Sequence, residues 1–553
     1  MARASLADRY RQRGSGRRCF CRERSAECKI GDVKRAIGLG SAFVSLVLLA
    51  ACDGGVAESV DGGWTPPTPG VAMTDVGEVR GVQEDDVFIY RGIPFAAAPV
   101  NDLRWRPPAA SGPFPEPFVA RQFGPVCMQA TASGQVGSED CLTLNVWTPS
   151  STADAPRPVL VNIHGGGNLV GSGSGPGMDG RVLVTRHDVV YVTLNYRLGP
   201  FGFFAHQAFR GENEYGASGN YGLMDQIAAL QWLQRNIAAF GGDPNRVLIF
   251  GYSAGSSNTC ALIASAEAAG LFSAAIYQSG PCTVRTDARM AELETRTTQA
   301  LGCTGAPDVA ACLRSKTPTE LLEVPGANLS TITNGRADFY TNVDGHVLTE
   351  DPVDTFLAGR NNPVSVIGGA TEYEYSTTVQ FFYETPPTND VEYRAVLSSL
   401  FGPEHTDTLA ARYSAAMYGS EVSALAALLS DLVMHCPYRR QLRALSQGPA
   451  PSVRRYVFAP SAGAGHGADA SLPIGQVTTP GWNGISEAIM GYWAAFAASG
   501  DPNGGTRADW PVYEPAADNY LVLSEQIEAA AGFRSSQCDF WDTSPLGDDP
   551  LGG

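Results

Sequence analysis

Lysine is almost absent from this chain. Lys316 is the only lysine after Cys52, and the 553 residues carry 39 Lys and Arg against 56 Asp and Glu, a formal net charge of -17. Residues 1–51 are basic, so the remainder holds 28 basic and 52 acidic residues, a net charge of -24. A surface this acidic repels phosphate backbones and anionic lipid headgroups. The composition therefore argues against nucleic-acid binding and against adsorption to a membrane by charge.

The short motifs of cofactor binding are missing as well. The sequence contains no metal-ligand cluster, no Walker loop and no dinucleotide fingerprint. We therefore expect neither a cofactor nor a metal ion.

The N-terminal segment has the features of a processing signal. Lys34 and Arg35 precede the uncharged run 36–51, which is short for a membrane span and shaped like the apolar region of a signal peptide. The run ends in Leu-Ala-Ala-Cys at Cys52, which is similar to the lipobox of bacterial lipoproteins, where the cysteine is lipidated. Ordinary cleavage after a small residue is the alternative. Both predict an exported protein, either an envelope lipoprotein anchored at Cys52 or a secreted or periplasmic one.

The remaining chain is predicted to form a single domain. Residues 52–70 are rich in Gly and Pro and have no apolar period, which predicts a flexible tether. Hydrophobic residues make up 44% of the chain and charged residues 17%, the balance of a globular protein. We expect one domain over residues 71–545 and a short tail over 546–553.

Strands and helices alternate through the centre of the chain. Apolar runs predict buried parallel strands at 159–164, 189–196, 247–253 and 274–280, and a helix is expected over 221–240, before Gly-Gly-Asp-Pro-Asn. Short antiparallel strands are expected before them, at 79–81, 87–96, 104–108 and 142–149. This order predicts a doubly wound, mostly parallel α/β sheet flanked by helices, with right-handed crossovers and helical insertions.

Two glycine motifs carry the chemistry. The strand 247–250 runs into Gly-Tyr-Ser-Ala-Gly at 251–255, the pattern of a nucleophile elbow centred on Ser253. The strand 159–163 runs into His164 and three glycines, whose N–H groups could reach a developing oxyanion, each donor being worth about 100- to 1,000-fold in rate. A plain Gly-rich turn is the alternative for the second motif. Both motifs follow predicted strands in hydrolase order, which favours acyl transfer through Ser253.

Longer motifs give the chain a family resemblance. EDCLTLNVW, VNIHGGGN, LNYRLGPFGFF, the stretch 219–255 and FSAAIYQSG occur in this order, and YWAAFAASGDPNG, WPVY and CDFWD close the series. They resemble the type-B carboxylesterase and cholinesterase family from about Val76 to Asp542. The resemblance implies an α/β-hydrolase fold and a serine carboxylesterase acting on a small-molecule ester.

A serine hydroxyl needs a base and an orienting acid, which follow it in this fold as acid and then histidine. His466 lies in GAGHGAD, which is similar to the family's GxxHGxD/E loop, and the other histidines after Ser253 are interpreted as structural or surface groups: His346, His405 and His435. The family's acid follows a strand ending in glycine, which corresponds to Glu374. Glu372 would share its face if this stretch is extended and remains the alternative.

The resemblance also assigns supporting residues. Backbone N–H groups of Gly166, Gly167 and Ala254 match the family's oxyanion hole. Ser279 matches a serine that supports the acid, or it is a turn residue at a strand end. Glu139 and Asp225 fall in family motifs and are interpreted as ion-pair partners within the fold.

The cysteines suit an oxidising compartment. The family pattern implies three disulfides: Cys127 with Cys141, Cys303 with Cys312, and Cys436 with Cys538. Cys260 and Cys282 are expected to be buried free thiols, and a fourth bridge between them is the alternative hypothesis.

Two departures from the family pattern limit the expected substrate. Tyr252 replaces the acidic residue that many relatives have beside the serine, and the loop between Cys127 and Cys141 lacks the tryptophan on which cholinesterases stack choline. A choline ester is therefore not the expected substrate. A catalytically silent surface protein of this fold, an amidase and a lipase stay as alternatives.

Overall fold

The structure is a computed structural model that describes residues 64–327, 338–376, 379, 385–544 and 546. The signal segment, Cys52, most of the expected tether and most of the C-terminal tail lie outside the described residues. Within them, no single helix is both long and apolar enough to cross a membrane. The helical segments Pro403–Tyr418 and Glu421–Gln447 are together long and apolar enough, but they meet at a bend of 119°.

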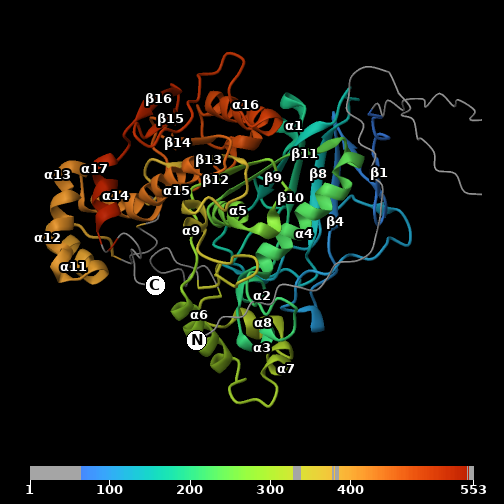
Figure 1. Cartoon of the computed structure of the whole chain (residues 1–553), viewed down its shortest axis with the longest axis horizontal. Coiled ribbons are helices and arrows are strands. Elements are labelled where there is room, and N and C mark those ends of the chain that lie inside the picture. Colours follow the sequence, from blue (N-terminus) through green and yellow to red (C-terminus); the bar gives the residue numbers. More distant parts are fainter. Residues whose placement is uncertain (1–63, 328–337, 377–378, 380–384, 545, 547–553) are drawn as a thin grey trace, which may run out of the picture. The chain divides into compact units, whose positions relative to one another are not determined.

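A mixed sheet of eleven strands forms the centre of the fold (Figure 1). In spatial order it contains β16 (Glu528–Ala531), β15 (Asn519–Leu523), β14 (Val453–Phe458), β13 (Ser365–Thr371), β12 (Ala274–Gln278), β11 (Gly242–Tyr252), β9 (Arg157–Ile163), β10 (Val190–Leu194), β8 (Thr143–Pro149), β4 (Val87–Pro94) and β3 (Val82–Glu84). The strands from β10 to β15 pair in parallel, and both ends of the sheet continue with antiparallel pairs. The predicted doubly wound α/β sheet is thus confirmed.

Helices cover both faces of this sheet. One face packs against α1 (Arg181–His187) and α16 (Asn483–Ser499), with a separate apolar core between them and the strands. The other face packs against α4 (Tyr221–Asn236), α5 (Ala254–Ala264) and α15 (Cys436–Gln447). The central strands are buried on both sides, which is why they read as continuous apolar runs in the sequence.

Shorter elements surround this frame. The small sheets contain β1 (Val71–Thr74), β2 (Gly77–Arg80) and β5 (Phe118–Val119), and the hairpin of β6 (Gln129–Thr131) and β7 (Gly134–Val136). The inserted helices are α2 (Gly199–Phe203), α3 (Gln207–Arg210), α6 (Asp287–Ala300), α7 (Val309–Arg314), α8 (Pro318–Leu322), α9 (Pro352–Leu357), α11 (Asp390–Phe401), α12 (Pro403–Arg412), α13 (Ala415–Tyr418) and α14 (Glu421–Ser430). A π-helical turn, η5 (Asp431–His435), joins α14 to α15, and 3-10 turns are η1 (Asn101–Leu103), η2 (Ile237–Phe240), η3 (Ala266–Ala268) and η6 (Leu472–Ile474).

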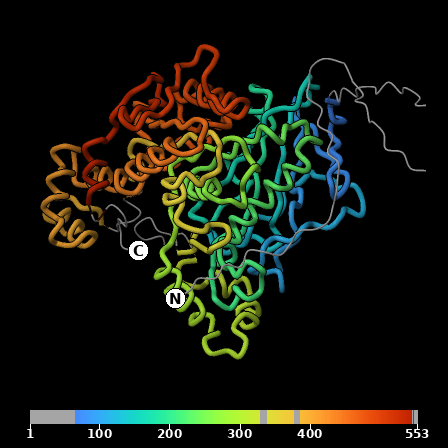
Figure 2. The backbone as a smooth tube through the Cα atoms, in the orientation of Figure 1, coloured from blue at the N-terminus to red at the C-terminus, as the bar shows by residue number. Residues whose placement is uncertain are grey.

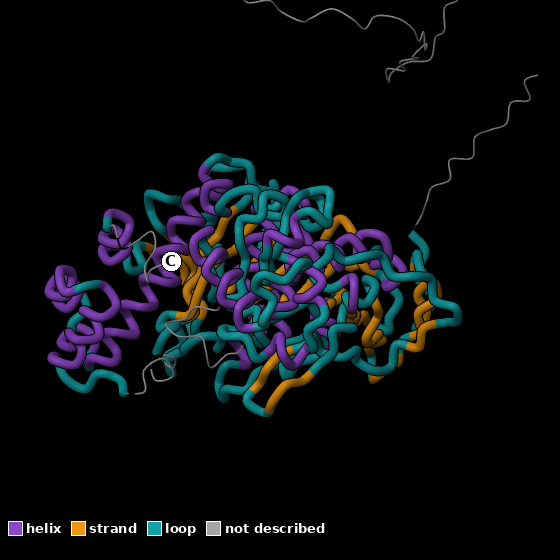
Figure 3. The backbone as a smooth tube through the Cα atoms, turned by 90° about the horizontal axis from the view of Figure 1, so that it is seen from below, coloured by secondary structure: helices purple, strands orange, loops and turns teal. Residues whose placement is uncertain are grey.

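The helical insertion α11–α14 lies beside the last helix, α17 (Ser535–Thr543). Figure 2 shows the two segments next to each other in orange and red, and Figure 3 shows the same helices to one side of the strands. Trp541 of α17 donates its indole N–H to the Tyr413 hydroxyl at 2.8 Å, which joins the two segments.

The strand expected at 104–108 is wrong. These residues follow η1 as an irregular segment, and Trp105 has a left-handed φ of 57°. The side chains decide this conformation: the Trp105 indole stacks on Phe209 and donates to the Pro200 carbonyl, and Arg104 forms a bidentate pair with Glu139. The last two residues of the predicted strand, Pro107 and Pro108, also have no N–H to donate to a neighbouring strand.

The expected ion pairs of Glu139 and Asp225 are present. Arg104 Nη2 lies 2.5 Å from Glu139 Oε1, and Arg197 Nη2 lies 2.7 Å from Asp225 Oδ1, with both Arg197 and Asp225 buried. A buried charge without such a partner would cost several kcal/mol, roughly 3–5 when one member of a pair is lost.

Four disulfides cross-link the described residues. Cys127–Cys141, Cys303–Cys312 and Cys436–Cys538 pair as the family pattern implies. The expectation of free thiols at Cys260 and Cys282 is wrong, because these two cysteines form the fourth bridge. Since β11 and β12 are parallel neighbours, the segment after β12 passes over the second turn of α5, and the two Cα atoms lie 5.3 Å apart.

Candidate active site

The candidate active site lies at the carboxyl ends of neighbouring parallel strands. Gly166 and Gly167 follow β9, Ser253 follows β11, Ser279 follows β12, Glu374 follows β13 and His466 follows β14. Ligands and reactive groups of open α/β sheets gather at this edge, because every crossover leaves a loop there.

Ser253 sits on a sharp turn between β11 and α5. Its φ of 55° and ψ of -126° are strained for a residue with a side chain, and its N–H donates to the Gln278 carbonyl at 2.9 Å. The turn needs glycine on either side. A Cβ at Gly251 would lie 2.5 Å from the Gly255 carbonyl oxygen, and one at Gly255 would overlap the Ile163 carbonyl.

His466 connects the serine to a buried carboxylate. Its Nε2 lies 2.9 Å from Ser253 Oγ, and its Nδ1 lies 2.6 Å from Glu374 Oε2. Glu374 is fully buried, and its other oxygen accepts the Thr371 N–H at 2.7 Å. The backbone N–H of His466 also donates to the Glu374 carbonyl at 3.0 Å, so the two residues are held together twice.

The alternative acid, Glu372, does not reach His466 by any described hydrogen bond or ion pair. Its backbone N–H donates to the Phe458 carbonyl at 2.9 Å, and its carbonyl accepts a hydrogen bond from His435. The structure therefore places Glu374, and not Glu372, against the imidazole.

The charges of this group are coupled. Burial alone would raise the pKa of Glu374, but the charge and hydrogen bond of His466, with Ser279 and the Thr371 N–H, bring that pKa below its ordinary value. Burial alone would lower the pKa of His466, but the charge and hydrogen bond of Glu374 raise it above its ordinary value. Each partner thus favours the charged form of the other.

The three backbone N–H groups expected to form the oxyanion hole belong to the loop after β9 and to the start of α5. Gly166 and Gly167 have positive φ values of 113° and 66°, and Ala254 is the first residue of α5. Among the described residues, none accepts a hydrogen bond from these three amides. A Cβ at Gly166 would overlap the Val170 carbonyl, so glycine is required for this path of the loop. These donors remain open to an incoming oxygen.

The remaining histidines after Ser253 have other partners. His346 stacks on Tyr215 with ring centroids 3.7 Å apart, His405 lies 3.8 Å from Glu404, and His435 is buried against Phe533. Their environments agree with the interpretation of structural or surface groups.

One charged group at the site was not predicted. Asp469 lies in the same loop as His466 and is buried, and its carboxylate accepts hydrogen bonds from Tyr456 and Gln278 at 2.8 and 3.3 Å. Burial and the neighbouring charge of Glu374 raise the pKa of Asp469 to about 6. The motif GAGHGAD contains this residue, so its acidic last position was the available signal.

The fold and this arrangement are those of the α/β-hydrolases. The solved structure titled PNB esterase matches with a TM-score of 0.73 and 30% sequence identity, covering 85% of this chain and 99% of that one.

The chain belongs to the carboxylesterase family, whose model matches residues 68–541. It is 37% identical to the fumonisin B1 esterase of Sphingopyxis macrogoltabida over 84% of this chain and 88% of that protein. It is 30% identical to carboxylesterase 1D of Rattus norvegicus over 86% of this chain and 93% of that protein. The protein is a carboxylic ester hydrolase.

Proposed function

We propose that the protein hydrolyses small-molecule carboxylic esters through a covalent acyl-enzyme on Ser253. The observation that carries this proposal is the continuous contact from Ser253 Oγ through His466 to the buried carboxylate of Glu374. A nucleophile, a base and an orienting acid in hydrogen-bond contact are the parts that acyl transfer requires.

Each residue has a distinct task in this mechanism. Nδ1–H of His466 donates to Glu374, which leaves Nε2 as the acceptor for the Ser253 proton. Ser253 Oγ then attacks the ester carbonyl, and Glu374 stabilises the imidazolium that forms. The amides of Gly166, Gly167 and Ala254 donate to the tetrahedral oxyanion. The imidazolium protonates the leaving alcohol, and a water activated by the same imidazole hydrolyses the acyl-enzyme.

Hydrolysis of p-nitrophenyl butyrate tests the nucleophile. Ser253→Ala should lower kcat by about 10⁶-fold, as removal of a catalytic serine does. Ser486→Ala is a matched control, because this serine is also buried but donates to the Leu472 carbonyl among the residues that pack on the other face of the sheet. A fluorophosphonate should label Ser253 alone in a peptide map. Full activity of folded Ser253→Ala would disprove the proposal.

Rates on matched amide substrates and on dispersed lipid would separate an esterase from an amidase or a lipase. The names of the relatives support the ester.

We also propose that residues 71–545 form one domain of an exported protein. One sheet contains strands from β3 near the beginning to β16 near the end, which supports a single domain. The four disulfides support an oxidising compartment. The intact mass of the mature N-terminal peptide would test lipidation of Cys52, since ordinary cleavage predicts a peptide without lipid.

A further inference from the structure

The loop that carries Glu374 is held by a single neighbouring segment on both sides of the acid. The Tyr375 N–H donates to Ser430 Oγ at 3.1 Å, and His435 Nε2 lies 3.1 Å from the Glu372 carbonyl oxygen. Because a carbonyl only accepts, this nitrogen of His435 carries the proton and donates. Ser430 and His435 therefore fix the backbone immediately after and two residues before Glu374.

The segment between these two residues is the π-helical turn η5. Here the Cys436 N–H donates to the Asp431 carbonyl, five residues back rather than four. In an α-helix, residues five apart would point about 140° away from each other, at 100° per residue. The wider π turn reduces this angle, so that Ser430 and His435 both reach the same loop. Turns of this kind inside helices occur often at functional sites.

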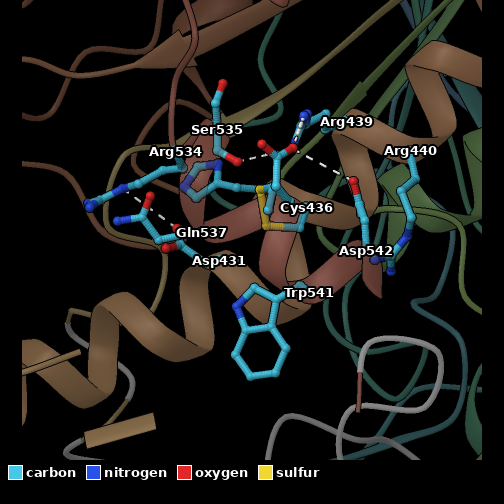
Figure 4. The surroundings of a disulfide bond; sticks show 12 residues. Asp431, Cys436, Arg439, Arg440, Arg534, Ser535, Gln537, Trp541 and Asp542 are labelled. Atoms are coloured by element: carbon cyan, nitrogen blue, oxygen red, sulfur yellow. Dashed lines mark hydrogen bonds and ion pairs between the residues drawn. A yellow bond between two sulfur atoms is a disulfide. The ribbon is translucent and has the colours of Figure 1, made fainter. Parts of the chain in front are cut away.

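The turn itself is anchored away from the loop. Asp431 accepts a hydrogen bond from the Tyr413 hydroxyl at 3.0 Å and lies 3.6 Å from Arg534 Nε. Cys436, the first residue after the turn, forms a disulfide with Cys538 (Figure 4). The view in Figure 4 shows Asp431, Cys436 and Arg534 together beside the last helix. These bonds make the turn a fixed support for the loop.

The His435 side chain has little freedom in this place. It is 2% exposed and lies edge-on against Phe533, with ring centroids 4.9 Å apart. Burial lowers its pKa to about 4, which keeps the ring neutral near neutral pH. A neutral ring with its proton on Nε2 is the form that donates to the Glu372 carbonyl.

We propose that His435 is a positioning residue for ester hydrolysis, holding Glu374 against His466 through its hydrogen bond to the Glu372 carbonyl. The inference rests on the proposed triad. It adds that the distance between Glu374 and His466 is set by the π turn as well as by β13. Loss of the hydrogen bond lets the Glu372–Tyr375 backbone move, and small misplacements of reacting groups cost about 100-fold in rate.

The test compares His435→Leu, which cannot donate, with His435→Gln, whose amide N–H can reach the same carbonyl. We expect His435→Leu to lower kcat for p-nitrophenyl butyrate by about 10- to 100-fold per fluorophosphonate-titrated site, with KM unchanged. His466 faces the carboxylates of Glu374 and Asp469. A less well placed Glu374 raises the His466 pKa less, so the acidic limb of kcat/KM should move to lower pH. His435→Gln should restore most of the parental kcat and most of the parental position of the acidic limb.

A purely structural role is separated by a matched control. His206→Leu removes another buried histidine, one that accepts the Ala208 N–H at the start of α3. It should lower the melting temperature without moving the pH limb. If His435→Leu does not fold, Ser430→Ala removes the second hydrogen bond and should lower kcat in the same direction.

Two outcomes would contradict the inference in different ways. The role of His435 would be overturned, and the triad left intact, if Glu374→Gln is crippled while His435→Leu keeps the parental kcat and the parental pH dependence. If His435→Leu does not fold, the same comparison is made with Ser430→Ala. Parental activity of Glu374→Gln would overturn the triad and the inference with it.

Discussion

Ser253 and Gly280 pack backbone against backbone where β11 and β12 end. A Cβ at Gly280 would overlap the carbonyl oxygen of Ser253, so the segment after β12 can pass the nucleophile only as glycine. The turn that strains Ser253 is thus supported by its neighbour in the sheet.

Gly280→Ala should therefore lower activity far more than an ordinary surface substitution. The added methyl group must displace the Ser253 carbonyl, and we expect a loss of about 100-fold or more in kcat/KM because the nucleophile moves. Gly211→Ala is the control, since its φ of -74° is ordinary and a Cβ there would meet no atom within 4 Å. Similar activity of the two variants on p-nitrophenyl butyrate would show that the close approach does not matter.

The two neighbouring glutamates should differ in effect. Glu374→Gln removes the charge that orients His466 and is expected to lower kcat by about 10⁴-fold, as loss of the orienting acid does in other triads. Glu372→Gln should stay within about twofold, because the Glu372 backbone, and not its carboxylate, makes the described contacts of this residue near the site. The ratio of the two kcat values measures the difference, and a ratio near one would contradict the assignment of Glu374.

Activity should fall as the solution becomes acidic. His466 accepts the serine proton only when it is neutral, and Glu374 raises the pKa of His466 above the ordinary 6.5. The acidic limb of kcat/KM should therefore have its midpoint above pH 6.5, with activity lost as pH falls through it. A midpoint below 6.5 in the parent protein would show that burial, which lowers this pKa, outweighs Glu374.

The Cys436–Cys538 disulfide should stabilise the fold more than Cys303–Cys312. The first closes a sequence separation of 102 and the second one of 9. In the chain-entropy model a loop of this longer kind contributes about 4.7 kcal/mol, against less than about 3 kcal/mol for a loop under 15 residues. Urea unfolding of the two Cys→Ser double variants would check the order. Equal free energies of unfolding would show that native-state contacts, and not loop closure, dominate.

Choline esters should show no advantage over neutral esters of the same shape. The loop between Cys127 and Cys141 contains no aromatic residue and folds as the hairpin β6–β7. A ring face would contribute roughly 0.5–2 kcal/mol to binding a quaternary ammonium group. The ratio of kcat/KM for acetylcholine to that for 3,3-dimethylbutyl acetate should therefore be near or below one. A ratio above about ten would reveal a cation site formed by other residues.

The sequence allowed the central sheet and the family to be predicted, because buried parallel strands and long motifs are local signals. The run 274–280 corresponds to β12 with a small change at its end, and the run 247–253 corresponds to the second half of β11, which begins earlier, at Gly242. The strand expected at 104–108 failed because Trp105 is held by Phe209 and Pro200, residues far away along the chain.

Contacts between distant segments explain the remaining differences. The bridge from Cys260 to Cys282 depends on two strands being neighbours, and the π turn depends on α14 and α15 meeting the loop after β13. Neither contact can be predicted from the spacing of residues along the chain. The sequence therefore identifies His435 only as a structural or surface histidine, although its hydrogen bond to the Glu372 carbonyl gives it a proposed part in the reaction.

The residues of the candidate active site are far apart in the sequence, so ester hydrolysis reports whether the whole sheet has folded. Ser253 and His466 lie 213 residues apart, and they meet only when β11 and β14 have joined the same sheet with β12 and β13 between them. No continuous fragment shorter than that separation can hold both groups. A chain cut or trapped between these strands would keep much of its secondary structure and lose hydrolysis, so a chromogenic ester can count the native molecules in a refolding mixture directly.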